Sequence, residues 1–142
     1  MVILDASAWL EFLQHPATDV GQEISRLLES EQIAVTGVVL GEVLGKARTE
    51  ADQARLRSAF EALPYVELSR ATWHRVGELS LQTRDSDELA TPAEARERSL
   101  SSPLPSNVLA VAALALERGY EVLSLDRRYR RIPGLTLHAR AS

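Results

Sequence analysis

The sequence predicts an α/β fold: a three-layer α/β/α sandwich around a mainly parallel sheet of four to five strands. Short apolar runs alternate along the chain with longer helical patterns, which is typical of a parallel sheet covered by helices. The first run, Val2–Leu4, is apolar at every position, as expected of a strand buried on both faces. Two of the runs lead into an aspartate, which would lie at the sheet edge where open α/β proteins bind ligands.

Further strands are expected at residues 33–37, 65–68 and 121–126, with 135–139 as a candidate fifth. Helices are expected between them, at residues 8–13, from 18 onward, 38–47, 49–63, from 69 onward and 106–118. In the helix after Ser69, we expect Trp73, Val76 and Leu79 to form one buried stripe. Gly119 is expected to cap the last helix.

Residues 84–105 interrupt this alternation. Their first part, RDSDEL, is polar and typical of a loop. In TPAE, Thr91 can cap a short helix that has a proline at its first position. We interpret the stretch as an insertion or lid within a single domain that spans residues 1–142.

The composition excludes several classes of protein. Of the 142 residues, 45% are hydrophobic and 25% are charged, which is ordinary for one globular domain. The absence of cysteine excludes disulfides and thiolate metal sites and fits a reducing cytoplasm. The N-terminus does not have the pattern of a signal peptide, and no apolar run is long enough to predict a membrane span. We therefore expect a cytoplasmic protein without a membrane partner.

Three acidic residues are the candidate catalytic site. Asp5 and Asp126 each follow a predicted strand, and Glu42 lies near the start of the helix after the second strand. Three carboxylates that converge raise one another's pKa values, and a divalent cation relieves the conflict. Oxygen ligands suit Mg²⁺ or Mn²⁺, which can activate water and neutralise a phosphate. The pattern therefore predicts metal-dependent phosphodiester hydrolysis.

Each acid also has a structural interpretation when it is taken alone. Asp5 can cap the first helix, Glu42 can be a surface helix residue, and Asp126 can initiate a turn. Ser7 can donate to a metal-bound water or to a phosphate, or it can cap the helix. The catalytic interpretation depends on the three acids meeting at one edge.

The basic residues indicate a possible contact with nucleic acid. Lys46 is the only lysine among the 16 basic residues, and four arginines cluster in DRRYRRIPG: Arg127, Arg128, Arg130 and Arg131. Arginine binds phosphate through two parallel hydrogen bonds and stacks on bases. The net charge of −4 weighs against this partner, and a solvated turn is the alternative. The remaining candidates are treated as structural: scattered histidines (His15, His74, His138) and core aromatics (Trp9, Trp73, Phe60).

Three segments resemble the PIN-domain ribonucleases, and VapC-type toxins in particular. VILDASAWLEFL is similar to their first motif, TGVVLGEVL to their second, and NVLAVAALALERGYEVLSLDRRYRRIPGL to their C-terminal block. The resemblance spans nearly the whole chain in the right order. It implies a PIN-like sandwich, Mg²⁺- or Mn²⁺-dependent endoribonuclease activity on RNA, a homodimer and a VapB-like antitoxin partner.

The chain departs from the family at one position. The family usually carries a third aspartate at the start of the alanine-rich helix, where a gapless count reaches Val108 in this chain. Asn107, one residue earlier, offers a neutral carbonyl oxygen. The unusual stretch before this helix also contains candidate substitutes: Asp85, Asp87 and Glu88. Without a substitute, Asp5, Glu42 and Asp126 would hold a single ion more weakly.

One rival function remains open, and a second is discounted. Val108 favours a degenerate PIN domain that binds RNA or an antitoxin without cutting. A phosphoacceptor receiver domain also has aspartates at strand ends, but it needs a lysine after a late strand, whereas Lys46 lies in a predicted helix.

Overall fold

The computed structural model describes residues 1–85 and 103–139. The expected insertion at 84–105 lies largely outside these residues, and so does the helix expected to begin at Thr91. The described part contains a parallel sheet of three strands, β1 (Val2–Leu4), β2 (Ile33–Ala34) and β3 (Glu121–Leu123). Their order in the sheet is β2-β1-β3, and all pairs are parallel.

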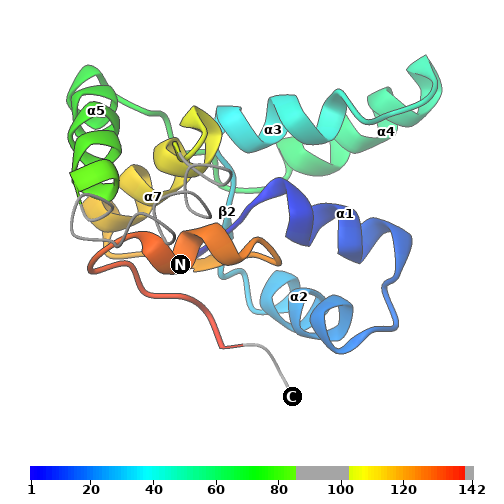
Figure 1. Cartoon of the computed structure of the whole chain (residues 1–142). Coiled ribbons are helices and arrows are strands. Elements are labelled where there is room, and N and C mark those ends of the chain that lie inside the picture. The colour runs from blue at the N-terminus through cyan, green and yellow to red at the C-terminus, as the bar shows by residue number, and fades with distance from the viewer. Residues whose placement is uncertain (86–102, 140–142) are drawn as a thin grey trace.

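Six α-helices of the described residues surround this sheet. They are α1 (Ala6–Gln14), α2 (Asp19–Glu29), α3 (Gly37–Leu44), α4 (Glu50–Glu61), α5 (Arg70–Asp85) and α7 (Ser106–Arg118). Figure 1 shows α1 and α2 on one side of β2, with α5 and α7 on the other. This arrangement confirms the predicted α/β class.

Two predicted strands are reduced to single bridges at the edges of the sheet. Tyr65 pairs with Val35 beside β2, and Leu137 pairs with Val122 beside β3, both in parallel. Each bridge has two backbone hydrogen bonds, such as Val66 N–H to the Val35 carbonyl at 2.8 Å. The prediction of four to five strands was therefore too high for the described residues. Weak alternation at 65–68 and the proline just before it give little support for a longer ladder.

The core is built from the strands and from α7. Every residue of β1 is buried, and α7 buries eight consecutive residues, Val108–Ala115. An element that is apolar on all sides belongs in the interior, and its alanines let neighbouring elements pack closely. Gly119 ends α7 with φ 66°, a left-handed conformation that glycine adopts without strain, as predicted.

The buried stripe of α5 differs from the prediction by one residue. Val76 and Leu79 are buried as expected, but Trp73 is 46% exposed. The buried face instead continues through Thr72 and Thr83, at helical spacing from Val76 and Leu79. Trp73 was therefore wrongly predicted as a core residue. Trp9 and Phe60 are buried as predicted, in an edge-to-face pair with centroids 4.9 Å apart.

Candidate active site at the carboxyl edge of the sheet

Asp5 lies at the junction of β1 and α1. It is 7% exposed, and its Oδ1 accepts the backbone N–H of Ala8 at 3.0 Å. The carboxylate therefore caps α1, as the structural interpretation expected. A cap needs only one of the two carboxylate oxygens, so the remaining contacts of Asp5 need a separate explanation.

Two serine hydroxyls hold the Asp5 carboxylate. Ser7 donates to Oδ1 at 2.6 Å, and Ser124 donates to Oδ2 at 2.5 Å. Ser124 is the first residue after β3, so its bond to Asp5 joins the ends of two neighbouring strands. Burial raises the pKa of Asp5, the donors Ser124, Ser7 and the Ala8 N–H oppose that shift, and the negative charge of Asp126 adds to it. Ser124 was not predicted as a site residue; its signal in the sequence is a serine directly after a strand and two residues before Asp126.

Asp126 starts the 3₁₀ helix η1 (Arg127–Arg131) and is paired with Arg128. Its Oδ1 accepts the backbone N–H of Arg128 at 3.0 Å, and the guanidinium donates to Oδ2 through Nη2 at 2.6 Å. The Arg128 hydrogen bond lowers the pKa of Asp126. Asp126 is thus a turn initiator, as its structural interpretation expected, and it keeps its negative charge.

Glu42 and Asn107 meet between α3 and α7. The Nδ2 of Asn107 donates to both carboxylate oxygens of Glu42, each at 3.2 Å. Val108 is 2% exposed and lies in the core. The start of α7 therefore directs Asn107, and not Val108, toward the acidic residues. Of the other candidates, Asp87 and Glu88 lie outside the described residues, as does the side chain of Asp85.

Tyr129 is a buried residue of η1 that is affected by the charges of the candidate acids. The side chain is 2% exposed. Burial raises the pKa of its phenol well above the usual range, and the negative charges of Asp5, Asp126 and Glu42 raise it further. One buried ring therefore experiences the field of all three candidate acids. Tyr129 was not assigned a site role from the sequence, although it stands within the C-terminal block that resembles the family.

The donor atoms of this site suit a hard divalent cation. Carboxylate, amide and hydroxyl oxygens come from Asp5, Glu42, Asp126, Asn107 and Ser7, without sulfur or imidazole. Among residues 1–85 and 103–139, however, no three His, Cys, Asp or Glu side chains form a ready metal-binding group. Two of the acids are instead each bound to a side chain that is not acidic. Arg128 donates to Asp126, and Asn107 donates to Glu42.

Thr36 supplies a further observation at the same edge. It follows β2 closely and is fully buried. Within the described residues its Oγ1 has no hydrogen-bond partner. A buried hydroxyl without a partner is costly, so this atom is suited to bind a water molecule or another polar group at the edge.

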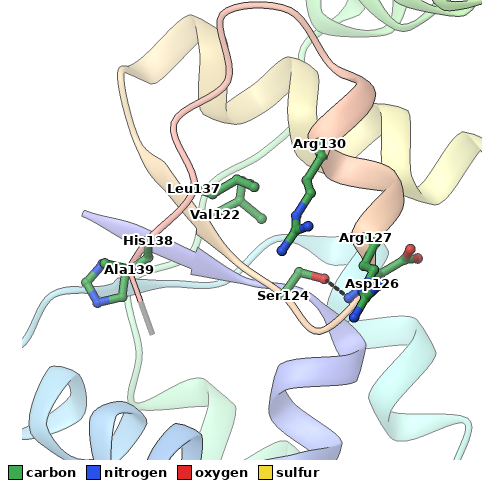
Figure 2. A pocket seen from close by; sticks show the side chains of 8 residues that line it. All are labelled: Val122, Ser124, Asp126, Arg127, Arg130, Leu137, His138 and Ala139. Atoms are coloured by element: carbon green, nitrogen blue, oxygen red, sulfur yellow. Dashed lines mark hydrogen bonds between the residues drawn. The ribbon is translucent and has the colours of Figure 1, made fainter. Parts of the chain in front are cut away.

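The four arginines of η1 have different surroundings. Arg128 is bound to Asp126, and Arg131 is partly buried. Arg127 and Arg130 are exposed and line a pocket together with Ser124 and Asp126, as Figure 2 shows. The cluster predicted from the sequence is therefore divided between an intramolecular ion pair and a pocket beside the acids.

His138 lies on the far side of that pocket. Its ring nitrogens contact Glu121 at 2.6 Å and Glu23 at 2.8 Å. These contacts join the C-terminal segment to β3 and α2. The prediction of a structural role therefore agrees with its position.

Comparison with known proteins identifies the family. The sequence model of the PIN domain matches residues 2–135. The chain therefore belongs to the PIN-domain family. No curated protein sequence matches the chain. None of the described helices has the length and apolar character needed to span a bilayer.

Solved structures with the same fold include several toxin–antitoxin proteins. VapBC2 from Rickettsia felis, bound to a promoter DNA fragment, is 18% identical, with a TM-score of 0.72 over 97% of this chain and 98% of that one. VapBC-1 from nontypeable Haemophilus influenzae is 14% identical, with a TM-score of 0.70 over 97% of both chains. VapC20 from Mycobacterium tuberculosis, a toxin that cleaves the sarcin-ricin loop, is 12% identical, with a TM-score of 0.60 over 99% and 100%. The PIN-like fold predicted from the sequence is thus confirmed.

Proposed function

We propose that this chain is a Mg²⁺- or Mn²⁺-dependent endoribonuclease, and that it is the toxin of a VapBC-type toxin–antitoxin pair. The observation that carries the proposal is the buried Asp5 carboxylate at the edge of the sheet. Its pKa is raised by burial and by the charge of Asp126. A buried acid beside a second acid is an unfavourable arrangement for stability alone and is typical of functional sites.

The residues of the site have separate roles in this proposal. Asp5, Glu42 and Asp126 would hold the ion, with the Asn107 carbonyl oxygen as a fourth participant. The ion would supply Lewis acidity, which neutralises charge on the phosphate and activates water. Ser7 and Ser124 fix both oxygens of Asp5 and so hold the carboxylate in one orientation. The η1 arginines would bind RNA phosphates.

The arrangement of Asp126 implies a rearrangement on ion binding. Its carboxylate is occupied by Arg128, whose guanidinium is a cation at the place where a metal would compete. The Arg128 side chain is 43% exposed, so it is free to move into solvent at low cost. Release of Arg128 would leave Asp126 available to the ion together with Asp5.

The toxin assignment is supported by the fold and by its neighbours. Several structural neighbours are described as VapBC structures, and one is described as a toxin that cleaves the sarcin-ricin loop. By analogy, the partners would be an RNA substrate and a VapB-like antitoxin, in the cytoplasm. A homodimer is part of the same proposal, and the exposed side chains of Tyr65 and Trp73 offer apolar surface for it. Light scattering of the purified chain tests the dimer.

Cleavage of RNA in the presence of Mn²⁺ tests the nuclease. We expect the wild-type protein to cut a mixed RNA substrate and Asp5→Ala to leave it intact. EDTA should stop the wild-type reaction. Equal cleavage by both proteins would refute the assigned site.

A second candidate is a degenerate PIN domain that binds RNA or an antitoxin without cutting. It is favoured by the neutral Asn107 at the start of α7 and by the paired state of the acids. Calorimetric titration with Mn²⁺ separates the two. Binding of about one ion per chain supports the nuclease, and no detectable binding supports the binding module.

A further inference from the structure

A pocket of about 350 Å³ lies directly beside the acidic site. It is formed by the end of β3, by η1 and by the C-terminal segment around Leu137, as Figure 2 shows. Ser124 and Asp126 line its inner end. Its volume falls in the range of small-molecule sites. Because Ser124 also donates to Asp5, a molecule in this pocket would lie next to the Asp5 carboxylate.

Two arginines give the pocket its charge. Arg127 and Arg130 both line it, and their spacing of three residues puts them on one side of a 3₁₀ helix. Figure 2 shows the guanidinium of Arg130 extending from η1 toward Val122 and Ser124. Among the contacts of residues 1–85 and 103–139, neither arginine has a hydrogen bond or an ion pair.

Asp126 is the one carboxylate that lines the pocket among the described residues, and it is already neutralised. Asp126 is bound by Arg128 through Nε and Nη2, at 2.6 to 3.0 Å. The charges of Arg127 and Arg130 are therefore available to an anion. His138, on the opposite wall, is held by two glutamates, so its hydrogen-bonding capacity is used there.

The rest of the opposite wall, around Val122 and Leu137, is apolar and is fixed to the sheet. Val122 is a buried residue of β3, and Leu137 pairs with it through a parallel bridge. Leu137 remains 38% exposed, which leaves one face of its side chain open to the pocket. The pocket thus combines two unpaired guanidinium groups with apolar aliphatic side chains, which together suit a phosphate joined to a partly apolar group such as a base.

We propose that this pocket binds one nucleotide of single-stranded RNA next to the phosphate that is cut, with its phosphate on Arg127 and Arg130 and its base against Leu137. The proposal rests on the proposed function, because it takes the acidic edge as the place of cleavage. It assigns different roles to the four arginines: Arg127 and Arg130 bind RNA, and Arg128 neutralises Asp126. Phosphate contacts from arginine position a strand, and burial of the base against an aliphatic side chain adds affinity through the hydrophobic effect, without reading the base edges.

Binding of a fluorescein-labelled RNA 12-mer in EDTA, measured by anisotropy, tests the pocket without any cleavage. We expect Arg127→Gln/Arg130→Gln to weaken binding at least tenfold and to reduce the salt slope by about 0.7, the value for one single-strand phosphate. Leu137→Ser should weaken binding severalfold while leaving the salt slope unchanged. The matched control, Arg48→Gln/Arg70→Gln, removes two exposed arginines elsewhere and should change binding less than twofold.

The outcomes separate this proposal from the nuclease assignment. If the pocket variant binds RNA as tightly as the control, the pocket assignment is wrong, whether or not the wild-type protein cleaves RNA with Mn²⁺. Binding of a glutamate-rich peptide in the pocket, without binding of RNA, would also contradict the pocket assignment. If the pocket variant loses RNA binding but the wild-type protein never cleaves, the pocket stands and the nuclease assignment fails. All variants should keep the wild-type unfolding temperature, since the substituted side chains are exposed.

Discussion

Asn107 donates its side-chain amide to both carboxylate oxygens of Glu42, each at 3.2 Å, and so joins the start of α7 to α3. An aspartate at this position would place a second negative charge against Glu42. The amide removes that repulsion, and it also carries a carbonyl oxygen that a cation can use. The neutral residue therefore lowers the affinity for a cation and raises the stability of the ion-free protein.

Asn107→Asp should have the opposite effects on stability and on cation affinity. The new carboxylate repels Glu42, so we expect a lower unfolding temperature without metal. It also adds a negative charge, so Mn²⁺ affinity should rise about tenfold or more. Calorimetry and thermal unfolding with and without Mn²⁺ measure both effects. Asn107→Ala is the control, because it loses the hydrogen bond but gains no charge. Unchanged Mn²⁺ affinity in Asn107→Asp would show that this position is not part of the ion site.

Asp5→Asn should separate function from stability. The raised pKa means that the protonated carboxyl is the form that folding favours. Its stabilising contribution is full below the unfolded pKa of about 3.9 and is lost as pH rises through the folded pKa. Above the folded pKa the buried charge is a cost to folding, which the isosteric amide avoids while still capping α1. We expect RNA cleavage to fall about 100-fold or more, with an equal or higher unfolding temperature. A large fall in unfolding temperature would indicate that Asp5 is mainly a structural cap.

Arg128→Gln should release Asp126. The ion pair is partly exposed, so its loss is worth about 0.5–1 kcal/mol. We expect Mn²⁺ affinity to rise roughly two- to fivefold, because the guanidinium no longer competes with the ion. Arg55→Gln is the matched control, since Arg55 forms a similar pair with Asp52 on α4. Lower Mn²⁺ affinity in Arg128→Gln would mean that Arg128 orients Asp126 toward the ion.

His138 should make stability depend on pH. Burial, its largest single influence, lowers the pKa of His138, but hydrogen bonds with Glu121 and Glu23 outweigh it, and the net pKa is raised. The contribution of the protonated ring is full below the unfolded pKa of about 6.5 and is lost as pH rises through the folded pKa. The unfolding temperature of the wild-type protein should therefore fall across this window more than that of His138→Gln. Parallel pH profiles of the two proteins would show that His138 is neutral in the folded state.

The fold could be predicted from the sequence because its signals are local. The apolar run of β1 and the alanine-rich α7 indicate buried elements. The glycine at φ 66° indicates the end of a helix. Strand extent could not be predicted, since pairing at Tyr65 and Leu137 depends on neighbours far along the chain. Trp73 was misplaced because a shift of one residue moves a side chain by about 100° around a helix.

The positions of the candidate residues at strand ends and in the helix after β2 could be predicted from the sequence, but their contacts could not. Strand-to-aspartate junctions indicated Asp5 and Asp126, and the helix after β2 indicated Glu42. The sequence could not decide whether Asn107 or Val108 faces the acids. That depends on which side of α7 packs into the core, and Val108 lies on the packed side. The Arg128 pair and the Ser124 hydrogen bond depend on side-chain rotamers at a loop, about which sequence spacing says nothing.

The central claim is that Asp5, Glu42 and Asp126 bind one divalent cation together. An anomalous difference map from crystals of the wild-type protein soaked in Mn²⁺ tests it most directly. The account predicts one peak within about 2.0–2.6 Å of oxygens from all three side chains, with Arg128 displaced from Asp126. A fully occupied peak elsewhere, or an unchanged Arg128–Asp126 pair with no peak at the sheet edge, would contradict it.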